Sequence, residues 1–168
     1  PVDVSAKLKS SIDALLDGGD AELGLESTVV DCSVERPCIL RLGNITLDEL
    51  NNDLGYEIAP NLQTIKQVKS PGQLLKHYSP DAELYLNQNR HDRGDVFLSF
   101  GPHPEEIDGL TLSDSKNLEE AAKNLFTFLH FLDRLSKARG GVPIKVAPIP
   151  SYGVGAAIND RLLRAAEK

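Results

Sequence analysis

The feature that most constrains the fold is an alternation of short apolar strands and amphipathic helices in the second half of the chain. The strand-like runs are residues 82–86, 96–100, 110–112 and 144–149. The longer helical pattern covers residues 117–138 and stops at Gly140-Gly141, and a second one covers residues 155–166. Strands that alternate with helices favour a parallel sheet with its helices packed on it. The sequence therefore predicts the α/β class, with a small, mostly parallel sheet over residues 81–168.

Residues 24–46 predict two short strands and the start of a helix. The β-branched run 28–30 suits a strand, residues 31–37 form a polar connection that ends in proline, and Ile39 resumes the apolar pattern. Thr46 with Glu49 three residues later has the spacing of a capping box. A helix is therefore expected to begin directly after Thr46.

The part of the chain before residue 50 holds too few elements for an independent domain. Ile12, Leu15 and Leu16 lie on one stripe of a helix expected over residues 5–16, which Gly18-Gly19 would end. One helix and two strands cannot cover both faces of an α/β sheet. Residues 1–57 are therefore interpreted as the C-terminal remnant of a larger α/β domain.

Polar side chains lie at the edges of the two early strands. Ser27, Thr28 and Arg41 stand where a polar pocket could use them. Another interpretation stays open: the hydroxyl groups could bond neighbouring backbone and the arginine could pair with a surface carboxylate. The residues alone do not choose between the two.

Three segments in order resemble one enzyme family. Residues 24–46 resemble the closing segment of the YrdC-type domain of threonylcarbamoyl-AMP synthases. Residues 70–80, which contain a His-Tyr-x-Pro signature, are similar to that family's interdomain linker, and residues 153–162 are similar to the last helix of its second domain. The resemblance implies a partial YrdC-like α/β segment over residues 1–57, a linker over residues 58–80 and a small Rossmann-like domain over residues 81–168.

The resemblance also implies an activity. Enzymes of this family condense L-threonine, bicarbonate and ATP into threonylcarbamoyl-AMP and pyrophosphate, for the threonylcarbamoyladenosine (t6A) modification of tRNA. Ser27 matches the serine that binds L-threonine, and Arg41 and Tyr78 match residues that contact ATP. His77, next to Tyr78, belongs to the linker that closes over the site as a lid. ATP is expected as a substrate, with Mg2+ accompanying it and no metal site of the chain's own, and downstream tRNA-modification proteins are expected partners.

Several positions depart from the family pattern. Gln73 and Leu74 stand where a methionine and a basic residue are usual, and Leu42 replaces a proline. The family's upstream ATP motif and Ser-x-Asn motif have no counterpart, so the chain resembles the C-terminal half of the enzyme. The isolated 168 residues are therefore expected to be inactive as a nucleotidyltransferase. The alternative is a non-catalytic, Rossmann-like binding or regulatory module.

Charge and composition narrow the classes of protein further. The net charge of −7 argues against a protein that binds nucleic acid over its whole surface. The expected linker carries a local basic cluster, formed by Lys66, Lys69, Lys76 and His77. The cluster is either a solvated loop or a lid that brings positive charge over a phosphate-bearing ligand. Direct contact with nucleic acid stays open. No membrane span is expected, and the low cysteine content fits a cytoplasmic protein.

One motif resembles a nucleotide fingerprint in part. Gly153-x-Gly155 lacks the third glycine of that fingerprint and lies at the end of the chain rather than in a first βα unit. Close packing of a helix on a strand explains these glycines more simply than a nucleotide site does.

Overall fold

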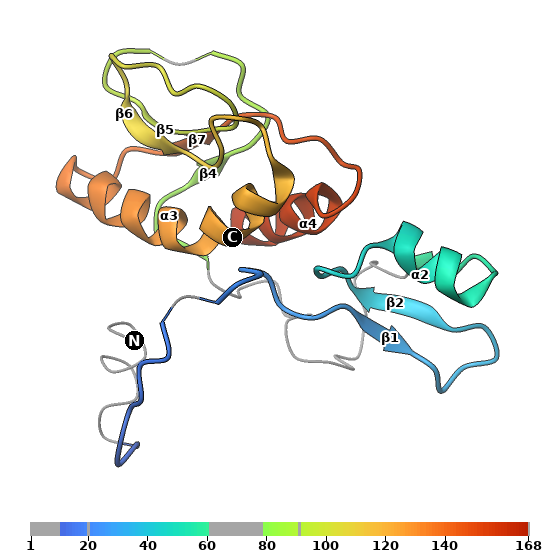
Figure 1. Cartoon of the computed structure of the whole chain (residues 1–168). Helices are drawn as coiled ribbons and strands as arrows, with labels where there is room; N and C mark the ends of the chain where they lie inside the picture. The colour runs from blue at the N-terminus through green and yellow to red at the C-terminus, as the bar shows by residue number, and fades with distance from the viewer. Residues whose placement is uncertain (1–10, 20, 61–78, 91, 168) are drawn as a thin grey trace.

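The structure, a computed structural model, describes residues 11–19, 21–60, 79–90 and 92–167. Within these ranges the chain forms two sheets (Figure 1). The elements of the first sheet and its helix are β1 (Val29–Asp31), β2 (Cys38–Arg41), α2 (Leu47–Leu54) and β3 (Ala59–Pro60). The elements of the second part are β4 (Leu84–Tyr85), β5 (Val96–Ser99), β6 (Asp108–Thr111), α3 (Leu118–Ala138), β7 (Ile144–Val146) and α4 (Gly155–Ala166).

The first sheet has the order β1-β2-β3. β1 and β2 are antiparallel, with Val30 opposite Ile39, and β3 runs parallel to β2. The capping box at the start of α2 is confirmed: the Thr46 hydroxyl accepts from the Glu49 amide, and the Glu49 carboxylate accepts from the Thr46 amide. This cap satisfies backbone donors that a helix start leaves unpaired, so it fixes where the chain turns from β2 into α2.

The second sheet has the order β4-β7-β5-β6, and all of its strand pairs are parallel. The predicted α/β fold with a small parallel sheet is therefore confirmed. β7 enters between β4 and β5, with Ile144 paired to both Leu84 and Val96. The chain reaches that central place through α3, which is the crossover that a parallel connection needs.

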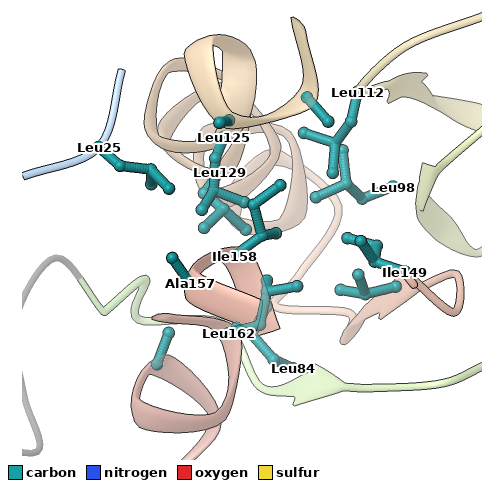
Figure 2. Packing of buried hydrophobic residues seen from close by; sticks show 14 of the residues in the cluster. Leu25, Leu84, Leu98, Leu112, Leu125, Leu129, Ile149, Ala157, Ile158 and Leu162 are labelled. Atoms are coloured by element: carbon teal, nitrogen blue, oxygen red, sulfur yellow. The ribbon is translucent and has the colours of Figure 1, made fainter. Parts of the chain in front are cut away.

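The core lies between the second sheet and its helices. α3 and α4 contact each other and lie along one face of the sheet (Figure 1). Leu98 from β5, Leu125 and Leu129 from α3, and Ile158 and Leu162 from α4 are all buried in one apolar cluster (Figure 2). The apolar stripe predicted for residues 117–138 is the face of α3 that this cluster buries.

One expectation differs from the structure, at the start of the chain, and the expected linker is described only in part. Residues 11–16, the described part of the helix expected over residues 5–16, are not helical. Leu16 is 94% exposed, so that part of the expected stripe has no apolar surface to pack against. Residues 59 and 60 pair with β2 although the linker was expected to begin at residue 58. Residues 61–78 of the expected linker lie outside the described residues, and the division into domains stays a prediction.

Candidate functional site

Ser27 and Arg41 meet at the ends of the first two strands. The Arg41 guanidinium donates from Nε and Nη2 to the Ser27 carbonyl oxygen, at 3.1 and 3.0 Å, and from Nη2 to the Ser27 hydroxyl oxygen, at 3.2 Å. Ser27 is exposed and Arg41 is half-buried. In the antiparallel register Arg41 lies opposite Val29, two positions after Ser27, and the Arg41 side chain reaches Ser27 although the two residues are 14 positions apart in sequence. Their roles toward ligands stay predictions.

The segment after Arg41 packs closely against the backbone around Ser27. A Cβ atom on Gly43 would lie 2.3 Å from both the Glu26 carbonyl oxygen and the Thr28 amide nitrogen. The Asn44 side-chain amide donates to the Leu25 carbonyl oxygen at 2.9 Å. Because both contacts join residues 25–28 to residues 43–44, the Ser27–Arg41 pair rests on a tightly fitted loop.

The Thr28 hydroxyl bonds nearby backbone and does not stand free to serve a polar pocket. Its hydroxyl donates to the Ile45 carbonyl oxygen at 2.6 Å, across the same loop. This bond leaves Thr28 as a brace of the backbone, directly before α2 begins. Ser27 and Arg41 are thus the two polar side chains at this edge that stay candidates for ligand contact.

Glu26 is tied to the last helix of the chain. The Arg161 Nε donates to the Glu26 carboxylate at 2.9 Å, and the Arg161 Nη2 donates to the Leu42 carbonyl oxygen at 2.7 Å. Burial by itself would raise the pKa of Glu26. The Arg161 hydrogen bond and the positive charges of Arg161 and Arg41 outweigh that effect and hold the pKa below its ordinary value. Glu26 is therefore ionised at neutral pH.

Arg161 is the residue that the sequence analysis missed. It lies in α4 on the buried stripe formed by Ala157, Ile158, Leu162 and Ala165. An arginine within an apolar helical stripe needs a partner, because a buried charge is costly without one. That position in the stripe is the signal that could have singled it out.

The predicted lid residues cannot be compared with these contacts. Tyr78 and His77, together with the basic cluster around them, lie outside the described residues. Ser79, the first described residue after them, donates from its hydroxyl to the Ala165 carbonyl oxygen at 2.7 Å. The end of the linker therefore joins α4, the helix that also carries Arg161.

A small hollow lies at the carboxyl ends of β4 and β7, beside α4. Its volume is about 170 Å³, below the roughly 300–1,000 Å³ of small-molecule sites. The Asn159 amide in its lining already donates to the Ile149 carbonyl oxygen at 3.0 Å. Nearby, a Cβ atom on Gly155 would lie 2.1 Å from the Pro150 carbonyl oxygen, which confirms close packing as the reason for that glycine. The hollow is a weaker candidate site than the Ser27–Arg41 pair.

The described part of the chain holds no group of three or more His, Cys, Asp or Glu side chains arranged to bind a metal ion. None of its helices combines the length and the apolar character that crossing a bilayer requires.

Comparison with known proteins relates this geometry to a family. Residues 45–167 match the family described as "Threonylcarbamoyl-AMP synthase, C-terminal domain". Three curated relatives carry the name threonylcarbamoyl-AMP synthase. The relative from Pyrococcus abyssi is 28% identical over 96% of this chain and 52% of its own length, and the one from Bacillus subtilis is 28% identical over 97% and 51%. The relative from Schizosaccharomyces pombe is 33% identical over 55% of this chain and 25% of its own length.

Solved structures of P. abyssi Sua5 also match the chain. The crystal structure of P. abyssi Sua5 complexed with L-threonine matches with a TM-score of 0.78 and 27% identity, over 97% of this chain and 52% of that one. A second structure of P. abyssi Sua5, with an adjacent histidine and tyrosine both replaced by alanine, matches with a TM-score of 0.78 and 25% identity over 97% and 51%. The chain spans about half the length of the P. abyssi and B. subtilis proteins.

Proposed function

Because this chain belongs to the threonylcarbamoyl-AMP synthase family, through the C-terminal domain that it shares with that family, we propose that it forms part of an L-threonylcarbamoyladenylate synthase. The reaction would serve the t6A modification of tRNA, in the cytoplasm and together with the proteins that complete that modification. The relatives named threonylcarbamoyl-AMP synthase support the activity, and the Sua5 structure with L-threonine supports threonine as a substrate.

The proposed reaction joins three substrates in two steps. The threonine amine and bicarbonate give a carbamate with loss of water. A carbamate oxygen then attacks the α-phosphorus of ATP, and the bond from that phosphorus to the bridging oxygen of pyrophosphate breaks. The charge develops on phosphate oxygens, so catalysis rests on positioning the reactants and neutralising charge.

The Ser27–Arg41 contact is the observation that carries the assignment of roles. The Arg41 guanidinium has the planar geometry that suits phosphate oxygens, and the Ser27 hydroxyl beside it is a small donor and acceptor for a polar substrate. The resemblance to the family assigns L-threonine to Ser27 and ATP to Arg41, and this chemistry is compatible with both roles. His77 and Tyr78 would close over both as a lid and exclude water, which protects a labile carbamate. The variant of P. abyssi Sua5 that lacks an adjacent histidine and tyrosine is relevant to this last role.

The proposed activity is tested in the protein as its gene encodes it. We expect the encoded protein, given L-threonine, bicarbonate and ATP, to release pyrophosphate in a threonine-dependent manner and to form threonylcarbamoyl-adenylate, detected by chromatography. The isolated 168 residues should form none. No product from the encoded protein would contradict the proposal and favour a non-catalytic binding module instead.

A serine pair in the same hairpin tests the role of Ser27. Ser27→Ala should raise the KM for L-threonine about tenfold, the effect of losing one hydrogen bond to a charged substrate. Ser33→Ala is the matched control, because the Ser33 hydroxyl donates to the Asp31 carboxylate at 2.6 Å within the turn. A KM for L-threonine that both substitutions leave unchanged would remove Ser27 from the site.

A further inference from the structure

Arg161 joins the last helix to the segments that precede β1 and follow β2, beside the two candidate site residues. The side chain is 6% exposed, and its three nitrogens all donate: Nε to Glu26, Nη2 to the Leu42 carbonyl oxygen, and Nη1 to Asp160 at 2.5 Å. Glu26 directly precedes Ser27 and Leu42 directly follows Arg41. A single guanidinium therefore holds the immediate neighbours of the two residues proposed to contact substrates.

Apolar contacts reinforce the same attachment. Leu25 is buried among the side chains of α3 and α4, with Leu125, Leu129 and Ile158 in the same cluster (Figure 2). A Cβ atom on Gly24 would lie 2.3 Å from the Lys123 Cα, so this backbone rests directly on α3. The segment before β1 accordingly runs beside α3 and α4 in Figure 1.

Charge and geometry make the arginine specific at this place. Glu26 precedes β1 and Leu42 follows β2, and a planar guanidinium can donate to the Glu26 carboxylate and the Leu42 carbonyl oxygen at once from separate nitrogens. A lysine presents a single ammonium group and cannot reproduce that fork. The Asp160 carboxylate, which accepts from the Arg161 Nη1, also pairs with Arg164 at 2.9 Å. This second pair holds the Asp160 carboxylate in place beside Arg161.

We propose that Arg161 is a positioning residue: through Glu26 and Leu42 it holds Ser27 and Arg41 in register, so that the C-terminal domain sets the geometry of the substrate site. This inference rests on the proposed function, since it takes Ser27 and Arg41 to contact L-threonine and ATP. Arg161 itself touches no substrate in this arrangement.

Hydrogen exchange tests the attachment without any need for activity. The encoded protein is compared with its Arg161→Met variant and with Lys145→Met, which removes an ion pair to Asp95 at 2.7 Å within the second sheet. We expect Arg161→Met to speed amide exchange in β1 and β2 at least about tenfold, because it removes the charge-assisted hydrogen bond to Glu26 together with the bond to Leu42, and to leave α3 unchanged. Lys145→Met should leave β1 and β2 unchanged. Equal exchange of these strands in the wild type and Arg161→Met would overturn the proposal.

Steady-state kinetics then test the effect on the site. Below the melting temperature of each variant, Arg161→Met should raise the KM for L-threonine at least about tenfold through the loss of both contacts, while Arg161→Lys, with one of the two contacts kept, should fall between it and the wild type. Lys145→Met should keep the wild-type KM. A lowered melting temperature with an unchanged KM would mean that Arg161 is merely structural and would overturn the proposal.

A second variant and the exchange measurement distinguish a failure of the positioning role from a failure of the proposed function. If Arg161→Met does not fold, Glu26→Ala carries the same test from the other partner, because it removes the carboxylate that accepts the Nε bond. If the wild-type protein forms no threonylcarbamoyl-adenylate, the proposed function fails and the role toward substrates fails with it. The exchange measurement then still decides whether Arg161 holds the two strands.

Discussion

Replacing Gly43 by alanine should disturb both the stability of the protein and the candidate site. The added Cβ would lie 2.3 Å from the Glu26 carbonyl oxygen and from the Thr28 amide nitrogen, and 2.5 Å from the Ser27 carbonyl carbon. These distances are roughly 1 Å shorter than the ~3.5 Å at which carbon atoms attract. All three neighbours are backbone atoms, so no side chain can rotate away. We expect a loss of about 1–3 kcal/mol in the free energy of unfolding, the range for overpacked positions.

The same substitution should weaken substrate binding, because the backbone that must move carries Ser27. Urea unfolding followed by circular dichroism measures the stability, and calorimetric titration with L-threonine measures the affinity, both in the encoded protein. Gly18→Ala is the control, since a Cβ there would have no atom within 4 Å. It should change the free energy of unfolding by less than about 0.5 kcal/mol. If Gly43→Ala unfolds at the same urea concentration as Gly18→Ala, the close approach at residue 43 is not what fits the loop to Ser27.

Three further outcomes are expected from urea unfolding. Leu125→Ala should cost about 2–5 kcal/mol because Leu125 is fully buried, whereas Leu163→Ala at the exposed side of α4 should cost less than about 0.5 kcal/mol. Thr46→Ala should cost about 1 kcal/mol through the lost cap of α2, and no loss would mean that the cap does not stabilise the helix. The pKa of Glu26 is lower in the folded than in the unfolded protein, so its stabilisation is complete above the ordinary value of 4.5 and is lost as the pH falls through the folded value. Glu26→Gln should flatten that acid limb of the free energy of unfolding, and an unchanged limb would contradict the Arg161 pairing.

The helices of the second domain were predictable because local signals agree with the packing. The expected helices over residues 117–138 and 155–166 are observed as Leu118–Ala138, with Asn117 as its cap, and as Gly155–Ala166. The parallel sheet followed from the alternation of elements. The strand order was not predictable in the same way, because a place between two other strands is decided by packing over the whole sheet.

Contacts between segments far apart in the chain could not be predicted from the sequence. Ser27 and Arg41 were singled out separately, and their contact depends on the pairing of β1 with β2, which places Arg41 opposite Val29 and within reach of Ser27. The place of Arg161 in an apolar stripe could mark it as unusual, but its partners, 119 and 135 positions away, could not be predicted from the sequence. The apolar spacing of residues 12–16 indicated a helix, but Leu16 has no surface to pack on and a short isolated helix is marginal.

A structure of the encoded protein with L-threonine and a non-hydrolysable ATP analogue is the most direct test of the Ser27–Arg41 pair as part of the substrate site. We expect the Ser27 hydroxyl within about 3 Å of L-threonine and the Arg41 guanidinium on phosphate oxygens, at ordinary hydrogen-bond distances. Arg161 should remain on Glu26 and the Leu42 carbonyl oxygen. Both ligands bound away from Ser27 and Arg41 would contradict the assignment.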